Sequence, residues 1–197
     1  MTIVGRNLGS FRDPSGHVFE ENGRVFRTVS KTAISDYEYL KKTRFYEKLH
    51  SSGLLIGSEE VDRSDLPKNA ALLLEHPKIP FISYPYEWGF LQLKAAALMH
   101  LDLQLLAIDN DGVMTDASAY NVQFVGSAPI FIDFLSFKPY RDGDYWDGHK
   151  QFCEQFLNPL LLWSKLGIPH NAWYRGNLEG LPTSNIIALL PWRKKLS

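Results

Sequence analysis

The pattern of apolar and polar residues predicts a β-hairpin near the start of the chain. The runs His17–Glu21 and Arg24–Ser30 are rich in β-branched and aromatic residues, and Asn22-Gly23 lies between them. Both residues of an Asn-Gly pair tolerate the positive φ angles of a two-residue hairpin turn. We therefore expect two antiparallel strands joined at Asn22-Gly23.

The spacing of apolar residues then changes to that of a helix and back to that of strands. Apolar side chains recur at helical spacing from Ser35 to about His50, where Ser51-Ser52-Gly53 ends the pattern, which predicts one helix of about four turns. Three short apolar runs follow around a polar loop and are predicted to be strands: Leu54–Gly57, Ala70–Glu75 and Ile79–Ser83. The first part of the chain is therefore expected to be β-rich with one helix.

Helical and hairpin patterns alternate in the second part of the chain. Leu, Ala and Met dominate Leu91–Ile108, which predicts a mostly buried helix. A loop with much hydrogen-bonding capacity, Met114–Asn121, comes next. Val122–Val125 and Ile130–Asp133 then predict a second hairpin whose last strand ends in a carboxylate, and a further helix is expected at about His149–Leu166.

Composition restricts the class of protein without identifying an activity. The 197 residues are 45% hydrophobic and 13% aromatic, enough for a packed core. Lys plus Arg number 21 against 22 Asp plus Glu, so the charge gives no reason to expect nucleic acid as a partner. The lone Cys153 cannot form an intramolecular disulfide, and the sequence has no Cys/His cluster for zinc. The sequence shows neither a secretory signal nor a run of about 18 apolar residues, so we expect a soluble, cytoplasmic protein without a membrane span.

One group of oxygen-bearing side chains indicates chemistry. Asp116 lies in the loop after the long helix, Asn121 follows at the mouth of the hairpin, and Asp133 ends the apolar strand. Phosphoryl transfer from ATP needs a carboxylate that orients the attacking hydroxyl and oxygen ligands that hold Mg²⁺. Each residue alone also fits a local role, as an Asx turn, a turn amide or a strand-end carboxylate. The order of helix, loop, hairpin and carboxylate favours the joint function.

At these residues the sequence resembles the protein-kinase-like superfamily, in particular its aminoglycoside and small-molecule phosphotransferases. TDASAYN resembles the D-x4-N catalytic loop of that family, and IFIDF resembles its metal-binding strand. The resemblance implies an α+β, two-lobed kinase-like fold with a β-rich N-lobe at 1–83 and a helical C-lobe at 84–197. It also implies that Asp116 is the catalytic base and that Asn121 and Asp133 are ligands of Mg²⁺.

The same resemblance assigns two further parts of a nucleotide site. Arg27 stands where the family has its phosphate-pairing lysine, and Glu38 stands where the glutamate partner of that lysine lies on the next helix. The aromatic linker, with Tyr84 and Tyr86, would face the adenine of ATP; core packing or a partner surface is the alternative for this segment. Arginine meets phosphate with a planar fork, so the exchange from lysine changes the contact.

The sequence departs from the family pattern at several points. Gly5, Gly9 and Gly16 are too widely spaced for G-x-G-x-x-G. Thr115 precedes Asp116 where arginine or glycine is usual, and Leu135 replaces the glycine after Phe134. These departures leave open a degenerate or repurposed kinase fold.

A second resemblance covers nearly the whole chain. The runs HPKIPFISYPYEWGF and DASAYNVQFVGSAPIFIDFLSF resemble the N-terminal region of bacterial SAM-dependent methyltransferase proteins, some of them related to nodulation proteins. The chain itself has no strand followed by a glycine-rich SAM-binding turn.

Three functions follow from the two resemblances. The first is Mg-ATP-dependent phosphoryl transfer to a hydroxyl of a small molecule or glycan. The second is a non-catalytic pseudokinase-like module associated with a methyltransferase domain or subunit. The third, a methyltransferase fragment that binds SAM, lacks the SAM-binding turn.

Overall fold

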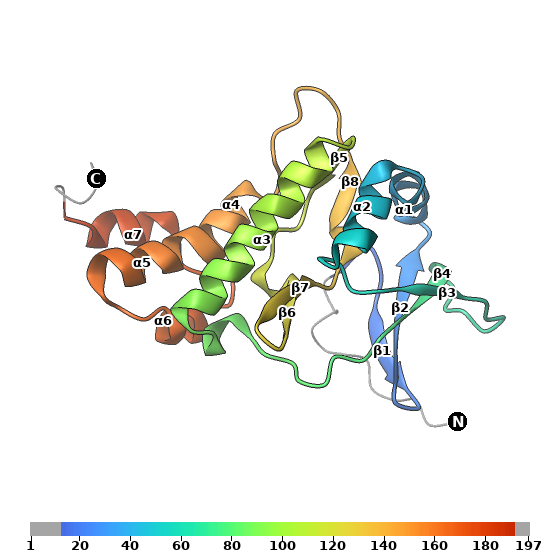
Figure 1. Ribbon diagram of the computed structural model, residues 1–197, viewed down its shortest axis with the longest axis horizontal. Coiled ribbons are helices and arrows are strands. Elements are labelled where there is room, and N and C mark those ends of the chain that lie inside the picture. The colour runs from blue at the N-terminus through green and yellow to red at the C-terminus, as the bar shows by residue number, and fades with distance from the viewer. Residues whose placement is uncertain (1–12, 192–197) are drawn as a thin grey trace.

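The N-terminal hairpin forms where the Asn-Gly pair predicts it. In the computed structural model, which describes residues 13–191, β1 (Val18–Glu21) pairs antiparallel with β2 (Arg24–Ser30). Asn22 and Gly23 adopt φ angles of 53° and 78°, as the tight turn requires. β2 also pairs with β4 (Ala70–His76), and β3 (Glu59–Val61) lies at the far edge, so the strand order is β1-β2-β4-β3 (Figure 1).

The single helix predicted from Ser35 to His50 is wrong, because the structure has two helices. α1 (Ile34–Lys41) and α2 (Arg44–Ser52) are separated at Thr43, whose ψ of 161° is extended. The Thr43 hydroxyl donates to the carbonyl of Leu40 at 2.6 Å. Leu40 and Phe45 on either side of the break are both fully buried. The change of direction lets both helices direct their apolar side chains into one core.

Two of the predicted strands are also absent. Leu54–Gly57 contributes only an isolated bridge between Leu55 and Phe131, and 79–83 has no regular structure, with Phe81 exposed to 74%. The observed edge strand β3 lies instead in the segment expected to be a polar loop. β3 pairs with β4 through a tertiary contact, which the acidic sequence Glu59-Glu60 does not predict.

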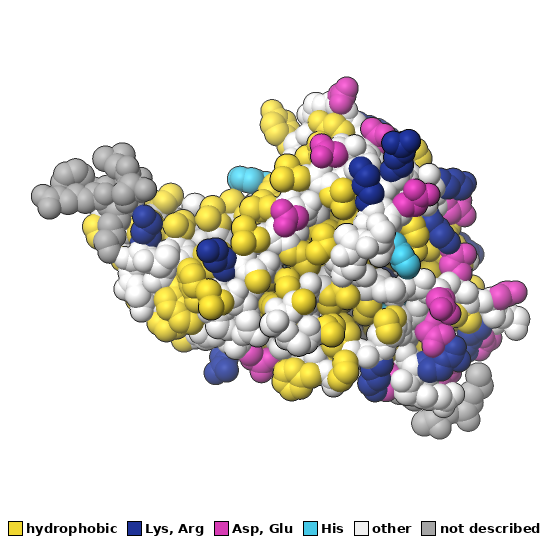
Figure 2. Space-filling model, in the orientation of Figure 1, with side chains coloured by type: hydrophobic (Ala, Val, Ile, Leu, Met, Phe, Trp, Pro, Cys, Tyr) yellow, Lys and Arg dark blue, Asp and Glu magenta, His cyan; other side chains and the backbone are white. Residues whose placement is uncertain are grey.

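The long predicted helix is present as α3 (Phe90–Ile108), which runs diagonally through the middle of the molecule (Figure 1). One face is buried, and the opposite face carries exposed leucines that form part of the apolar surface in Figure 2. By length and composition this helix could cross a membrane, but helices in the cores of soluble proteins have the same properties.

The second hairpin, β6 (Val122–Val125) with β7 (Ala128–Phe131), is confirmed, and Gly126 takes the positive φ of its turn. Asp133 lies two residues beyond β7 instead of at its end. Two short strands flank this hairpin in sequence and pair with each other, β5 (Gly112–Met114) and β8 (Phe137–Pro139). The predicted loop between β5 and β6 contains only a 3-10 turn at Ala119–Asn121.

The predicted C-terminal helix is confirmed, with one irregularity. It begins as α4 (His149–Phe152), widens to a π-helix at Cys153–Leu157 and continues as α5 (Asn158–Leu166). Pro159 has no N–H for the carbonyl of Gln155, and Tyr174 donates its hydroxyl to that carbonyl instead, at 3.3 Å. Tyr174 lies on α6 (Asn171–Gly176), which precedes α7 (Thr183–Leu189); both lie beyond the last helix that the sequence predicts.

The larger of two hydrophobic clusters in the described residues joins the sheet to the helical part. Its buried residues come from both parts and include Val29, Phe45, Leu103, Phe131 and Phe156. The segment before β3 also bonds to β7, because Ile56 N donates to Phe131 O and Phe131 N donates to Leu54 O. The two parts of the described chain are therefore packed against each other through shared side chains and backbone bonds.

His100 lies in this core on α3 and is fully buried. Its Nδ1 lies 3.2 Å from the carbonyl of Ala96, and its ring packs against Phe131 and Phe156. Burial lowers the pKa of His100 to about 4. The folded protein therefore holds this ring neutral at pH values where the unfolded chain protonates it.

We predict that His100 makes the fold sensitive to acid. Between its unfolded pKa near 6.5 and its folded pKa of about 4, the unfolded state binds more protons, so stability falls as the pH falls. From pH 7 to pH 5 this one group costs about 2 kcal/mol. Urea unfolding of the wild type and of His100→Gln at both pH values should show a smaller pH difference in the variant.

The exposed His149 provides the control for this experiment. His149→Gln should retain the full pH difference of the wild type, because it changes an exposed residue outside the core and leaves His100 in place. An equal pH difference in wild type and His100→Gln would contradict the prediction. Some pH dependence should remain in His100→Gln, since burial also lowers the pKa of His76 and His170.

Candidate functional site

Arg27 lies between two carboxylates that come from distant parts of the chain. It points from β2 into the protein, where its side chain is only 8% exposed. Its Nη2 is 2.6 Å from Asp13 Oδ2 and 2.9 Å from Asp133 Oδ1. A buried guanidinium needs such partners, because an unpaired charge in the interior is strongly unfavourable. The contact joins the N-terminal sheet to the turn after β7.

The charges around Arg27 show that a third carboxylate is near. Burial raises the pKa of Asp13, Arg27 opposes that rise, and the negative charges of Asp133 and Asp116 add to it. Asp116 and Asp133 therefore both lie within electrostatic reach of Asp13. The site is a cluster of carboxylates around the guanidinium of Arg27.

A single short turn brings together the three residues that the sequence singled out. Asp133 starts the 3-10 turn Phe134–Ser136, and its Oδ1 accepts from Leu135 N at 2.9 Å. Asn121 donates its side-chain amide to Ser136 Oγ at 3.0 Å. The backbone N–H of Asp116 donates to Ser136 O at 3.4 Å. The turn is thus held by Asp116 and Asn121 and begins with Asp133.

Each of the three side chains keeps an oxygen without a hydrogen bond among residues 13–191. Asp133 uses Oδ1 for Arg27 and for Leu135 N, which leaves Oδ2. Asn121 uses its nitrogen, which leaves its carbonyl oxygen, and Asp116 uses Oδ1 for Ser118 N, which leaves Oδ2. Carboxylate and amide oxygens are ligands that Mg²⁺ accepts. In the described part of the chain no three His, Cys, Asp or Glu side chains are grouped as a metal site, so a metal here would depend on Asn121 as well.

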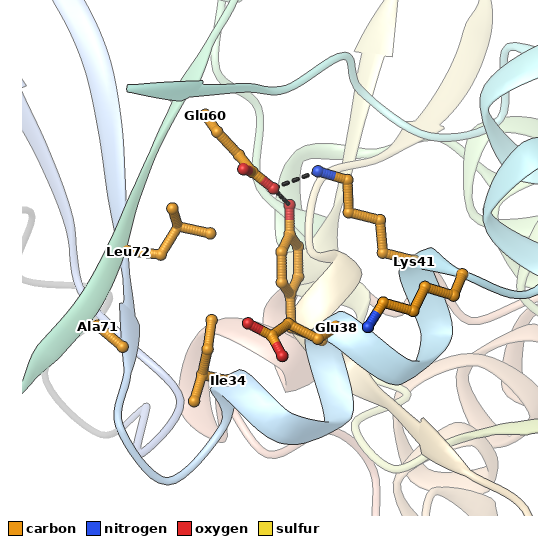
Figure 3. Close-up of a pocket in the computed structure, with 8 residues that line it drawn as sticks. Ile34, Glu38, Lys41, Glu60, Ala71 and Leu72 are labelled. Atoms are coloured by element: carbon orange, nitrogen blue, oxygen red, sulfur yellow. Dashed lines mark hydrogen bonds and ion pairs between the residues drawn. The ribbon is translucent and has the colours of Figure 1, made fainter. Parts of the chain in front are cut away.

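Glu38 and Arg27, which the kinase resemblance pairs, do not meet in this structure. Glu38 lies on the exposed face of α1 and lines a pocket of about 510 Å³ between α1 and β4 (Figure 3). The neighbouring Tyr37 takes the core-facing position and donates its hydroxyl to Glu60 at 3.1 Å. Lys41 also bonds to Glu60, so that side of α1 has its own ion pair. The guanidinium of Arg27 pairs with Asp13 and Asp133 instead of with Glu38.

Tyr84 and Tyr86 stack on each other in the linker before α3. Their ring centres are 5.4 Å apart, and the 3-10 turn Pro85–Glu87 holds them in place. Asn171 donates to Tyr86 O at 2.8 Å, and His170 Nε2 lies 3.1 Å from Pro85 O, so α6 supports the turn. No described contact joins either tyrosine to the cluster around Arg27. Their role toward adenine stays a prediction.

Sequence reasoning missed Asp13 and the glycine that brings it in. Gly16 lies so close to β2 that a Cβ on it would be 1.7 Å from Thr28 O, and only glycine permits this approach. Backbone bonds from Thr28 N to His17 O and from Ser30 N to Ser15 O hold the segment there. Gly16 was noted only as part of a loose glycine-rich stretch. Its other members, Gly5 and Gly9, lie outside the described residues.

Gln155 is the second residue that was missed. It lies in the π-helix, is 2% exposed, and accepts from Ala119 N at 2.8 Å and from Ser118 Oγ at 3.3 Å. It therefore fixes the loop that carries Asp116 and Asn121. A glutamine inside the apolar run of the C-terminal helix was the available signal.

Replacing Gln155 should destabilise the fold through this loop. Gln155→Ala leaves the buried N–H of Ala119 without an acceptor, at a cost of about 1–3 kcal/mol. Urea unfolding would measure the loss. Gln151→Ala, on the same helix and partly exposed, is the matched control and should change stability far less. Equal effects of the two substitutions would contradict the role given to Gln155.

The two carboxylates around Arg27 should act as a unit. Asp13→Asn or Asp133→Asn alone leaves the guanidinium one carboxylate, whereas the double variant strands a buried charge. We expect the double variant to lose more stability than the two single losses added together, by about 1–2 kcal/mol. Glu75→Gln, at the exposed pair of Glu75 with Arg24, serves as the surface control in urea unfolding. Additive losses would show that the two carboxylates act independently.

Comparisons with known proteins find one similar sequence and one similar solved structure. No protein-family model matches the chain. The chain is 50% identical over 192 residues, 96% of its length, to nodulation protein NoeA of Rhizobium meliloti (strain 1021). It spans only 40% of that protein.

The solved structure of vaccinia related kinase 3 superposes with a TM-score of 0.48 and 14% identity, over 92% of this chain and 68% of that one. This similarity is too low to transfer a site or an activity. The described chain itself is a mixed α+β structure with a small β-rich N-terminal part and a helical C-terminal part, which confirms the α+β class predicted from the sequence.

Proposed function

We propose that this chain is a kinase-like domain that transfers a phosphoryl group from Mg-ATP to a hydroxyl of a small molecule or glycan. In this proposal 1–83 is the N-lobe, 84–197 is the C-lobe, and the site lies where Arg27 meets the turn of Asp133. The observation that carries the proposal is the turn Asp133–Ser136, because Asp116 and Asn121 both bond to it.

The free oxygens of the site suit this chemistry. Asp133 Oδ2 and the carbonyl oxygen of Asn121 would hold Mg²⁺, which supplies charge neutralisation for the phosphates. Asp116 Oδ2 would orient the acceptor hydroxyl and take its proton. The Asx turn from Asp116 Oδ1 to Ser118 N fixes the carboxylate for that task.

Arg27 supplies the positive charge toward phosphate. Its buried Nε has no hydrogen-bond partner among the described residues, so the guanidinium has an N–H donor available for a ligand. An arginine fork can bind phosphate through two parallel N–H groups. A phosphate oxygen that displaces Asp13 would satisfy this donor and keep the guanidinium neutralised.

A non-catalytic, pseudokinase-like module is the second candidate. Asp13 and Asp133 already neutralise Arg27. The positive charge that would bind phosphate is therefore paired within the fold. In addition, the chain spans 40% of NoeA, so it corresponds to one part of a longer protein. As such a module it would bind a nucleotide, a substrate or a methyltransferase domain without turnover.

Nucleotide binding is tested first, because phosphoryl transfer from ATP requires it. We expect ATP with Mg²⁺ at 100 times its dissociation constant to stabilise the wild type by about 2.7 kcal/mol in a thermal-shift assay. Asp133→Asn should lose this stabilisation. Asp144→Asn, in an exposed loop, should keep it. SAM in place of ATP should produce no shift.

Turnover separates the catalyst from the module. With radiolabelled ATP and a panel of polyhydroxylated acceptors, Asp116→Asn should bind ATP like the wild type but lose about 10²–10⁴-fold in phosphoryl transfer. ATP binding by the wild type without transfer or ATP hydrolysis would favour the pseudokinase-like module. No response to ATP and Mg²⁺ at all would overturn both nucleotide-based functions.

A further inference from the structure

The outer face of α3 carries an apolar stripe that nothing in the described chain covers. Its members are apolar and each is more than a third exposed: Leu91, Leu98, Leu101, Leu105 and Ile108. With Lys94 these positions follow one another in steps of three and four, the spacing of the contact seam between two packed helices. Figure 2 shows apolar side chains along this part of the surface.

The helix cannot hide this stripe by turning. Its opposite face is already committed to the core, where Leu93, Ala96 and Leu103 are fully buried. Leu91 and Leu105 are 77% and 62% exposed, well beyond the exposure of an ordinary edge position. An apolar stripe of this kind across a 19-residue helix marks a surface that associates with a partner protein or a membrane.

Two charges on the stripe indicate which helix covers it. Lys94 lies four residues before Leu98 and Asp102 lies four residues after it; both are exposed, and neither is in an ion pair among the described residues. In two copies of α3 packed antiparallel about Leu98, Lys94 of one copy lies level with Asp102 of the other. The same pairing occurs twice, because a two-fold interface repeats every contact.

One apolar pair of the stripe obeys the same symmetry. Leu91 is seven residues before Leu98 and Leu105 is seven after it, so leucine meets leucine on both sides of the axis. A parallel pair would instead align Lys94 with Lys94 and Asp102 with Asp102, which is unfavourable. A lipid surface would gain nothing from the opposite charges at this spacing.

We propose that the α3 stripe is a homodimer interface in which two copies of the helix pack antiparallel about Leu98. The occupant is therefore a second copy of this chain. The interface lies on the outer face of α3, and the proposal does not depend on the proposed function.

The oligomeric state of the full chain tests the proposal. Sedimentation velocity over a wide concentration range should show a monomer–dimer equilibrium, and Leu98→Glu should raise the dimer dissociation constant by about 30-fold or more. The matched control is Leu178→Glu, since Leu178 is 54% exposed against 52% for Leu98 but lies outside α3. That variant should dimerise like the wild type.

Charge reversal tests the antiparallel arrangement. Lys94→Glu or Asp102→Lys alone sets like charges against each other and should weaken the dimer by about tenfold. The double variant Lys94→Glu/Asp102→Lys restores opposite charges and should recover most of the affinity. All five variants change exposed side chains, so their melting temperatures measured in dilute, monomeric samples should match the wild type.

Three results would overturn the proposal. The first is a wild-type monomer at every concentration, and the second is a dimer that Leu98→Glu leaves intact. The third is the absence of recovery in the double charge variant, which would exclude the antiparallel pairing about Leu98. Binding of a monomeric wild type to phosphatidylcholine vesicles would assign the stripe to a membrane and contradict a protein partner.

Discussion

The buried charge of Arg27 is the constraint on which the rest of the site depends. A guanidinium 8% exposed on a core-facing strand position must be neutralised, and here carboxylates from two remote segments do so. Asp13 holds the N-terminal segment against β2, and Asp133 holds the turn after β7 against the sheet. Removing one buried charge therefore affects two connections at once. The sheet and the helical part are joined by electrostatics as well as by the apolar core.

The turn Asp133–Ser136 extends this network into the helical part. Asn121 and Asp116 bond to Ser136, and Gln155 holds the loop between them from the C-terminal helix. Pro159 follows the π-helix and has no N–H for the carbonyl of Gln155, to which Tyr174 donates its hydroxyl. A local irregularity of one helix thus supports the loop that carries the proposed catalytic groups. The side chains that carry the free oxygens of the site are held by Leu135 N, Ser136 Oγ and Ser118 N.

Both faces of α3 are apolar, but only one of them is buried in the core. Its inner face fills the core shared by both parts of the chain, and its outer face presents leucines with two opposite charges. The almost continuous apolar composition of this helix, which predicts burial, therefore needs a separate explanation for each face. Burial within the chain accounts for one face only, and the other face is where the structure leaves room for association.

Local signals in the sequence determined the two hairpins, the long helix α3 and the C-terminal helix, because turn residues and apolar spacing act over a few neighbours. They also singled out Asp116, Asn121 and Asp133, which the folded chain gathers at one turn. Tertiary contacts decided the rest: the break at Thr43, the edge strand β3, and Asp13 as the partner of Arg27 where Glu38 was expected. Such pairings depend on which distant segment the fold places beside a buried group with a matching charge and shape. A local sequence pattern carries no information about that.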